Sequence, residues 1–338
     1  FLGYGLAISA SSTPFAALLV DVTSERQRPA LVSVVWSMLT VGIVAGAILA
    51  SRFLGTACAS TDLDLVIAGV ERLIVVAPLV IFGLILLAVV GVERPVEPQS
   101  KEAKPAADRP AELSFGQAWT VLRASPQVAY FFGVLSLFTF SLFLQEAVLE
   151  PYGGAIFGMD VCATTRLNAI WGVGTLVGIA STGFLLVPRL GPQRTALLGG
   201  VLAGVFVLLM VVAGAVVSEP LFRLALLLFG YAAGVSTNAS LTLMLGLTSP
   251  ALAGTFIGVW GLAQAYARGV ATVTGGGLLS LFGGVFGGQD TYGAYASVFV
   301  IQAVGLLLAG LLLLRVDTTL FQQRVQRALG DLLAMELD

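Results

Sequence analysis

The chain has 338 residues, of which 57% are hydrophobic and only 11% are charged, and its formal net charge at pH 7 is −2. Soluble domains average about 25% charged residues, so this composition excludes an ordinary soluble protein. The near-neutral charge gives no reason to expect nucleic acid as a partner. Apolar runs of about 20 residues, long enough to cross a bilayer as helices, recur along the sequence. The short alternating segments of a membrane β-barrel are absent. We therefore predict an all-α polytopic membrane protein.

The chain has no histidine and two cysteines, Cys58 and Cys162. Without histidine it lacks the usual general base and the commonest metal ligand. No nucleophile motif or metal-ligand spacing is present either, so we expect no enzyme activity. Both cysteines fall in predicted loops on the outward side of the membrane. A disulfide could form there, but we expect two free thiols.

The predicted elements follow in chain order. Residues 92–112 are rich in proline, alanine and charge and have no apolar anchors, which predicts a linker. A capping box at Ser114 then begins a short amphipathic helix on the membrane surface. The predicted organisation is a partial N-terminal half at 1–91, the linker with its surface helix at 92–126, a six-span half at 127–314 and an amphipathic tail at 315–338. The nine predicted spans are 1–20, 31–50, 73–91, 127–147, 167–187, 195–215, 221–245, 254–282 and 294–314.

Polar residues gather where the span at 127–147 ends. Pro151 and the pair Gly153-Gly154 predict that the helix stops there. Three polar side chains would then lie where the helix leaves the hydrocarbon, namely Gln145, Glu146 and Glu150. They mark either a simple exit into water or a polar site at the mouth of a helical bundle. Glu150 is also expected to form a surface pair with Arg166 or Asn168, which would contribute little stability.

Lysine and arginine lie mainly on the side of the membrane that holds the linker, which predicts that this side is cytoplasmic. The linker and the C-terminal tail are then cytoplasmic, and Glu146 faces outward.

A weak internal repeat relates residues 1–36 to residues 229–261. Each copy has a Gly-Tyr pair, a helix of small residues, a Thr-Ser loop and a span with a tryptophan, Trp36 or Trp260. Three spans precede the second copy after the linker, and none precedes the first. Equivalent halves would therefore require three further N-terminal spans. Twelve spans in two parallel halves, nine of them present here, is the architecture of the major facilitator superfamily, which we predict.

Arg268 falls in the middle of the span at 254–282, where an ionised guanidinium needs a partner. Glu146 is within its reach if the two helices adjoin. Such a pair either only holds helices together or forms a gate or a ligand contact. Asn238 belongs to a polar stripe on the span at 221–245. That stripe either makes hydrogen bonds between helices or lines a central cavity.

Several segments resemble the PucC, or bacteriochlorophyll-delivery, family of the major facilitator superfamily. They are Leu144–Gly154 (LQEAVLEPYGG), Phe157–Met159, Thr165–Leu167, Trp171–Thr175 and Gly254–Gly269 (GTFIGVWGLAQAYARG). The resemblance covers nearly the whole chain except the linker and the tail. Residues 1–50 are more similar to cyanobacterial members than to those of purple bacteria.

The resemblance implies a protein of a thylakoid or of a bacterial inner or intracytoplasmic membrane. It implies that the protein binds or delivers chlorophyll or bacteriochlorophyll, or chaperones the assembly of light-harvesting or photosystem complexes. Antenna or photosystem subunits and chlorophyll-synthesis enzymes would be its partners, besides membrane lipids. With no histidine to bind the pigment magnesium, the candidate pigment-binding or gating residues are Gln145, Glu146, Glu150, Arg268, Gln264, Asn238, Trp171 and Trp260.

Two other functions stay open. A proton-coupled secondary transporter of a small solute would need a titrating carboxylate inside the bundle, and Glu146 is the nearest one in the nine predicted spans. An assembly scaffold without a ligand would need neither Glu146 nor Arg268.

Overall fold

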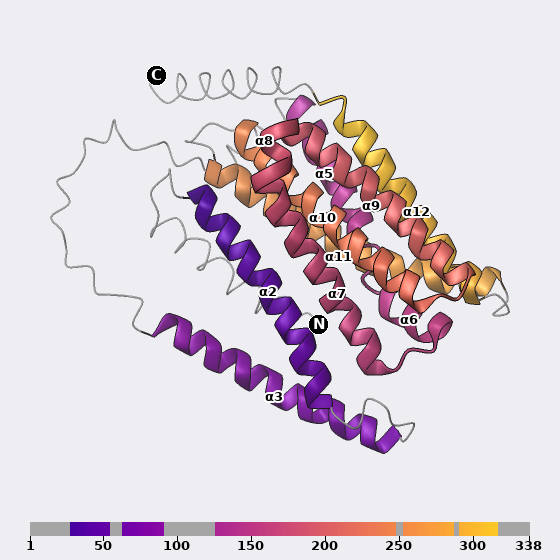
Figure 1. Ribbon diagram of the computed structural model, residues 1–338. Helices are drawn as coiled ribbons and strands as arrows, with labels where there is room; N and C mark the ends of the chain where they lie inside the picture. Colours follow the sequence, from indigo (N-terminus) through magenta and orange to yellow (C-terminus); the bar gives the residue numbers. More distant parts are fainter. Residues whose placement is uncertain (1–27, 55–62, 91–125, 248–252, 287–290, 317–338) are drawn as a thin grey trace, which may run out of the picture.

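The computed structural model describes residues 28–54, 63–90, 126–247, 253–286 and 291–316 (Figure 1). The predicted span at 1–20, the linker with its surface helix and nearly all of the tail lie outside these residues. The described chain is built from α-helices and one short π-helix, η3. The elements are α2 (Arg28–Leu54), α3 (Leu63–Val89), α5 (Pro126–Phe143), α6 (Leu149–Phe157), α7 (Val161–Ser181), η3 (Thr182–Leu186), α8 (Val187–Leu190), α9 (Pro192–Ala215), α10 (Glu219–Leu247), α11 (Ala253–Val285) and α12 (Thr291–Leu313).

Five helical segments of the described chain are long and apolar enough to cross a membrane. The prediction of an all-α polytopic membrane protein is confirmed, whereas the two-repeat arrangement stays a prediction. α3 begins at Leu63 rather than at residue 73, so Asp64 and Glu71 lie within a helix and not in a loop. The five segments are Ile67–Leu87, Val161–Leu190, Pro192–Ala215, Glu219–Met244 and Thr291–Leu313.

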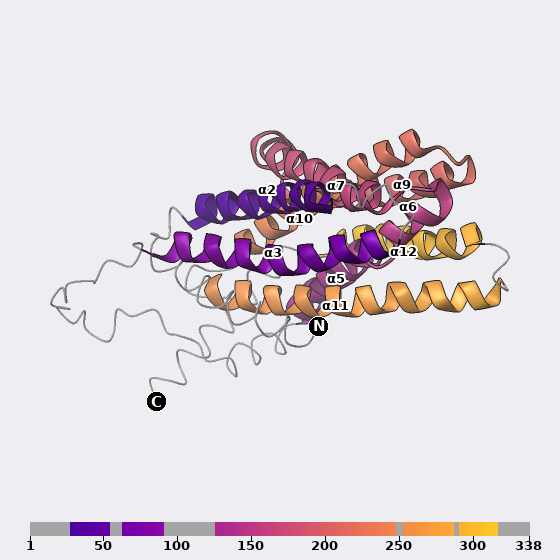
Figure 2. The same ribbon diagram turned by 90° about the horizontal axis from the view of Figure 1, so that it is seen from below.

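Helices α5 to α12 form one bundle in which the chain passes back and forth between two ends (Figures 1 and 2). We call the end with Pro126, Gly191 and Leu313 the linker end, and the end with Asp160 and Glu219 the opposite end. α2 packs along α7, and α3 lies beside α2.

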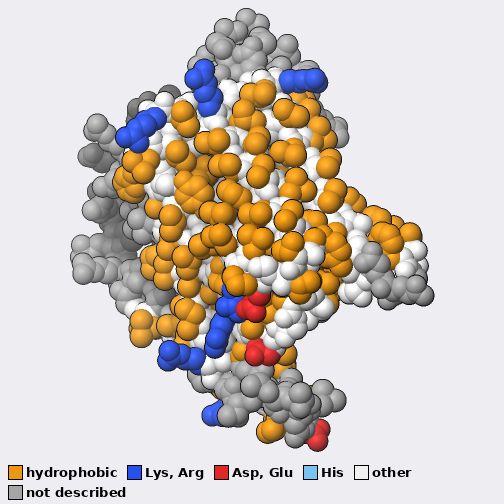
Figure 3. Space-filling view, turned by 45° about the vertical axis from the view of Figure 1, so that its right-hand side comes forward, with side chains coloured by type: hydrophobic (Ala, Val, Ile, Leu, Met, Phe, Trp, Pro, Cys, Tyr) orange, Lys and Arg blue, Asp and Glu red, His pale blue; other side chains and the backbone are white. Residues whose placement is uncertain are grey.

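Hydrophobic side chains cover most of the face in Figure 3, and charged side chains gather toward its two ends. Large hydrophobic side chains of the described chain are highly exposed, including Phe184 at 85% and Val273 at 77%. A soluble monomer rarely exposes so extended an apolar surface to water. Contact with lipid explains it.

α7 and α10 cross at very short range because glycines of both helices lie in the crossing. Gly174 and Gly178 of α7 face backbone carbonyls of α10, and Gly230 and Gly234 of α10 face backbone carbonyls of α7. A Cβ atom at any of these four positions would lie less than 3.0 Å from a facing carbonyl oxygen. Four-residue spacing of small residues is how membrane helices approach closely. The crossing fixes the turn of α7 that carries Trp171.

Cys162, at the start of α7, is disulfide-bonded, so the expectation of two free thiols is wrong. The only other cysteine of the chain is Cys58, which lies outside the described residues. The Cys162 Sγ lies 3.4 Å from the carbonyl oxygen of Ser51, near the end of α2. Because α2 packs along α7, two segments more than 100 residues apart in sequence meet at the opposite end of the bundle. Spacing along the chain could not reveal this proximity.

Candidate functional site

The first helix of the bundle is broken into two pieces. α5 ends at Phe143, residues 144–148 form turns, and α6 begins at Leu149. The prediction that Pro151 and Gly153-Gly154 end the helix is wrong, since all three lie inside α6. Proline is tolerated there because it lies in the first turn, where the backbone N–H has no acceptor within the helix. The helix end lies before the proline, not after it.

The break lies about half-way through the bundle. Gln302, near the middle of the 23-residue helix α12, donates its Nε2 to the carbonyl oxygen of Leu142 at 3.3 Å. Arg268, near the middle of the 33-residue helix α11, pairs with Glu146. Glu146 thus lies at the mid-depth of the bundle and not at its outward boundary. Apolar residues flank the break on both sides, so hydropathy alone could not locate it.

Tyr152 anchors α6 to the rest of the bundle. Its side chain is fully buried, and its hydroxyl donates to the carbonyl oxygen of Met210 at 3.1 Å. Its ring centroid lies 4.9 Å from that of Phe299 and 5.4 Å from that of Phe222, both with edge-to-face geometry. Such aromatic pairs add to the energy of apolar burial. Firm packing of α6 makes the position of the preceding turn well defined.

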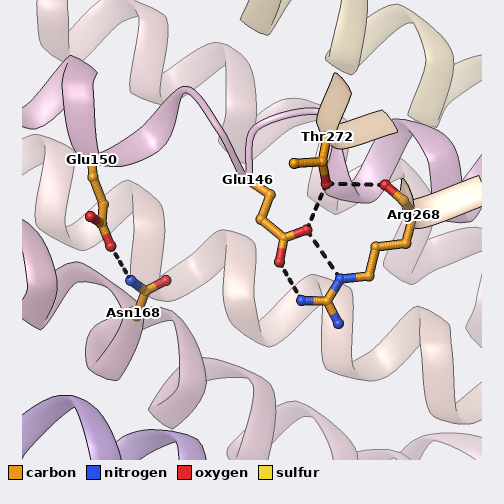
Figure 4. A network of polar contacts seen from close by, with 5 residues as sticks. All are labelled: Glu146, Glu150, Asn168, Arg268 and Thr272. Atoms are coloured by element: carbon orange, nitrogen blue, oxygen red, sulfur yellow. Dashed lines mark hydrogen bonds and ion pairs between the residues drawn. The ribbon is translucent and has the colours of Figure 1, made fainter. Parts of the chain in front are cut away.

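Two residues of α11 hold the Glu146 carboxylate (Figure 4). Arg268 donates from Nε to Oε2 at 3.0 Å and from Nη2 to Oε1, and Thr272 donates from Oγ1 to Oε2 at 2.9 Å. The Arg268 Cζ also lies 4.5 Å from the ring centroid of Phe143, the last residue of α5. The side chains of Glu146 and Arg268 are 35% and 53% exposed. The pair therefore stays accessible at a depth where an unpaired charge would be costly.

A cavity of about 340 Å³ adjoins this network. It lies between α2, α5, α7, α10 and α11, and its volume is at the lower end of the range for small-molecule sites. Most of its lining is apolar. Polar contacts come mainly from threonines and from two residues one turn apart on α11, Gln264 and Arg268. The aromatic residues of the lining are Phe143, Trp171 and Trp260.

Four of the eight predicted site residues, namely Arg268, Gln264, Trp171 and Trp260, thus line one cavity, and Glu146 lies beside it through Arg268. The other three lie elsewhere. Glu150 accepts a hydrogen bond from Asn168 at 2.5 Å, apart from the Glu146 network (Figure 4). Asn238 donates to the carbonyl oxygen of Ile179 at 3.2 Å and so ties α10 to α7. Gln145 is buried at 6% exposure, and its Oε1 has no hydrogen-bond partner in the described chain.

Sequence reasoning missed Thr272 and Gln302, which both position the break. A signal for Thr272 exists, because it follows Arg268 by four residues and so shares its helix face. The sequence carries no such signal for Gln302, since a single amide within an apolar span is compatible with many packing contacts. No three metal-ligating side chains cluster anywhere in the described ranges. A metal held at this site would therefore have to bring most of its own ligands.

The model of the PUCC protein family matches residues 1–321. Three curated relatives are each 29% identical to the chain. The bacteriochlorophyll synthase 44.5 kDa chain of Rhodobacter capsulatus aligns over 319 residues, 89% of this chain and 68% of the relative. Protein PucC of Rhodovulum sulfidophilum aligns over 82% and 58%, and an uncharacterized protein in the puhA-bchM intergenic region of Rhodobacter capsulatus over 91% and 63%. The chain spans roughly two thirds of the length of these relatives, and with nearly every residue matched by the family model, it belongs to the PUCC protein family.

Proposed function

We propose that this membrane protein works in photosynthesis by binding or delivering a chlorophyll-type pigment, or by chaperoning light-harvesting or photosystem complexes during assembly. Family membership and a relative named for bacteriochlorophyll synthase support the connection to pigment. The cavity beside Glu146 and Arg268 carries the proposal. It joins an apolar, tryptophan-containing lining to the polar side chains of Gln264 and Arg268 at mid-depth. These are the properties that an apolar ring with a polar centre requires.

The cavity also determines how such a ligand would act on the protein. Leu39, Thr40 and Ile43 of α2 form part of its lining, and the remainder comes from the bundle. A bound ring would therefore contact both the segment before the linker and the segment after it. We infer a binding role rather than a catalytic one for this chain. We place the linker and the C-terminus on the cytoplasmic side of a thylakoid or bacterial photosynthetic membrane.

Co-purification tests this function. The tagged protein is isolated in mild detergent from photosynthetic membranes, and its absorption spectrum and bound proteins are recorded beside those of an unrelated membrane protein with the same tag. We expect a chlorophyll-type band together with antenna or photosystem subunits or enzymes of pigment synthesis. Absence of both pigment and such partners would contradict the proposal. Alanine at Gln145, Glu146 and Arg268 separates a scaffold from a pigment carrier. A ligand-free scaffold would keep its partners in all three variants.

Proton-coupled transport of a small solute is a second candidate, because Glu146 lies at mid-depth beside a cavity. A transporter needs a carboxylate that can exchange protons within the membrane. The test uses proteoliposomes with a pH-sensitive dye inside and screens small solutes. Solute-dependent proton entry that Glu146→Gln abolishes and Glu219→Gln preserves would establish transport. Solute transport that is unchanged in Glu146→Gln would exclude coupling to protons through this carboxylate.

A further inference from the structure

We propose that Glu146 would hold the central metal of a neutral metallo-tetrapyrrole through its carboxylate, with Arg268 and Thr272 as the residues that position that carboxylate. The site would then select a pigment that carries a metal over the same pigment without one. This inference rests on the proposed pigment-binding function and names the group that recognises the pigment.

The hydrogen bonds of Glu146 leave room for a ligand. A carboxylate offers about four acceptor positions on its two oxygens. Within the described part of the chain, Arg268 Nε and Thr272 Oγ1 both donate to Oε2, whereas only Arg268 Nη2 donates to Oε1. One acceptor position on Oε1 is therefore unused while the ion pair stays intact. Carboxylate oxygens are ordinary ligands of hard divalent cations such as magnesium.

The charge balance of the pair suits a neutral ligand. A carboxylate bound alone to a neutral metallo-tetrapyrrole would place a net negative charge at mid-depth, which is costly in a bilayer. Arg268 offsets that charge without occupying the last position on Oε1. Thr272 fixes the other oxygen, as the outer partners of metal ligands commonly do.

The alternative ligands near the break are less suitable. The chain has no histidine. Gln145 is 6% exposed and faces the packed interior, whereas Glu146 is 35% exposed. Gln264 lines the cavity one helical turn from Arg268 and would supply a neutral amide contact to the ring. Glu146 is thus both accessible and the stronger donor.

The cavity and the Glu146 network share two residues, Phe143 and Arg268. A ring with one edge in the cavity would therefore also reach the ion pair beside it. With about 340 Å³ the cavity accommodates an edge of the macrocycle rather than a whole pigment with its tail. The rest of the ligand would lie outside the cavity, where the side chains of Glu146 and Arg268 are 35% and 53% exposed. The bound metal supplies a Lewis-acidic centre, and the protein supplies the carboxylate, its counter-charge and the apolar wall.

The experiment compares chlorophyll with pheophytin, which has the same ring without the magnesium. Binding to the full-length protein in detergent is measured by quenching of tryptophan fluorescence. Resonance Raman spectra of bound chlorophyll report the coordination number of the metal. We expect the wild-type protein to bind chlorophyll at least about tenfold more tightly than pheophytin, since even outer partners of a metal ligand contribute about that factor.

Glu146→Gln should weaken the binding of chlorophyll and leave the binding of pheophytin unchanged, so that the ratio of the two affinities falls to roughly one. It should also change the Raman marker of metal coordination. The double variant Glu146→Gln/Arg268→Gln also removes the arginine charge that Glu146 balances, and it should give the same result if the single variant fails to fold. Glu219→Gln is the matched control, because Glu219 forms an ion pair with Arg223 at 2.5 Å with comparable exposures of 42% and 45%. It should keep the full preference.

Equal wild-type affinities for the two pigments would overturn the inference and leave the pigment-binding function intact. So would a preference that survives in both Glu146 variants. Failure of the wild-type protein to bind either pigment would contradict the pigment-binding function itself and the inference with it.

Discussion

Two contacts between helices of this bundle differ in kind: one is made by backbone atoms and the other by polar side chains. The α7–α10 crossing joins two regular helices backbone to backbone at Gly174, Gly178, Gly230 and Gly234. The contact between the α5–α6 break and α11 joins an irregular turn to a helix through side chains that are 35% and 53% exposed. The first contact has no room for a methyl group. The second keeps polar groups within reach of a ligand. A rigid crossing beside an accessible ion pair is how a bundle can hold its shape while it presents a site.

A substitution at the glycine crossing should have the largest effect on stability. Gly178→Leu should abolish folding, because its Cβ would overlap the Tyr231 carbonyl oxygen and neither backbone can shift alone. Overpacking typically costs about 1–3 kcal/mol and occasionally more, and we expect an overlap with backbone to lie at the upper end. Fluorescence-detected size-exclusion chromatography after heating measures the effect. Gly133→Leu is the control, because a Cβ at Gly133 meets nothing within 4 Å. A Gly178→Leu protein as stable as this control would show that the crossing is not close-packed in solution.

The ion pair gives the next largest effect. Arg268→Gln leaves the Glu146 carboxylate without its counter-charge, and the exposure of the pair limits the expected loss of stability to about 1–3 kcal/mol. Glu146→Gln/Arg268→Gln should regain most of that loss, since both groups are then neutral. Thermal unfolding of the two single variants and the double variant gives the coupling energy directly. Strictly additive losses would mean that the two side chains do not interact.

Tyr152 should have a smaller effect. Tyr152→Phe keeps the aromatic packing and removes only the hydrogen bond to the carbonyl oxygen of Met210, which costs about 1 kcal/mol. Tyr266→Phe, at a side chain that is 76% exposed, should be neutral. Thermal unfolding in the same detergent compares the two. Equal melting temperatures for both variants would mean that the Tyr152 hydroxyl does not anchor α6.

Loss of the Thr272 hydroxyl should have the smallest effect on stability. Thr272→Val removes one of three hydrogen bonds to Glu146 and preserves the ion pair, so we expect less than about 1 kcal/mol of lost stability. Its effect should appear in pigment coordination before it appears in stability, because it removes one of the two donors that position Oε2 and leaves the other, Arg268 Nε, in place. Melting temperature and the Raman marker are recorded together. A stability loss as large as that of Arg268→Gln would assign Thr272 a structural role instead.

The fold class and most helices follow from the sequence because long apolar runs admit few alternatives in a membrane. The approach of Arg268 to Glu146 was foreseen for a related reason, since a charge in mid-span needs a counter-charge. The break at residues 144–148 could not be foreseen from Pro151, because proline fits the first turn of a helix as well as the residue after one. The bonded state of Cys162 depends on α2 packing along α7, which no local pattern encodes. The role of Thr272 could be predicted from its position one helical turn beyond Arg268. The role of Gln302 could not be predicted from the sequence.

The most direct test of the account is the absorption spectrum of the purified protein when its cavity is filled by a side chain. Ala265 lines the cavity and is itself exposed, so Ala265→Trp fills the site without opening the core. Ala180→Trp, at an exposed alanine of α7 outside the lining, is its control. We predict that the wild-type protein and Ala180→Trp carry a chlorophyll-type band and that Ala265→Trp has lost it. An equal band in Ala265→Trp, or no band in the wild-type protein, would contradict the assignment of this cavity as the pigment site.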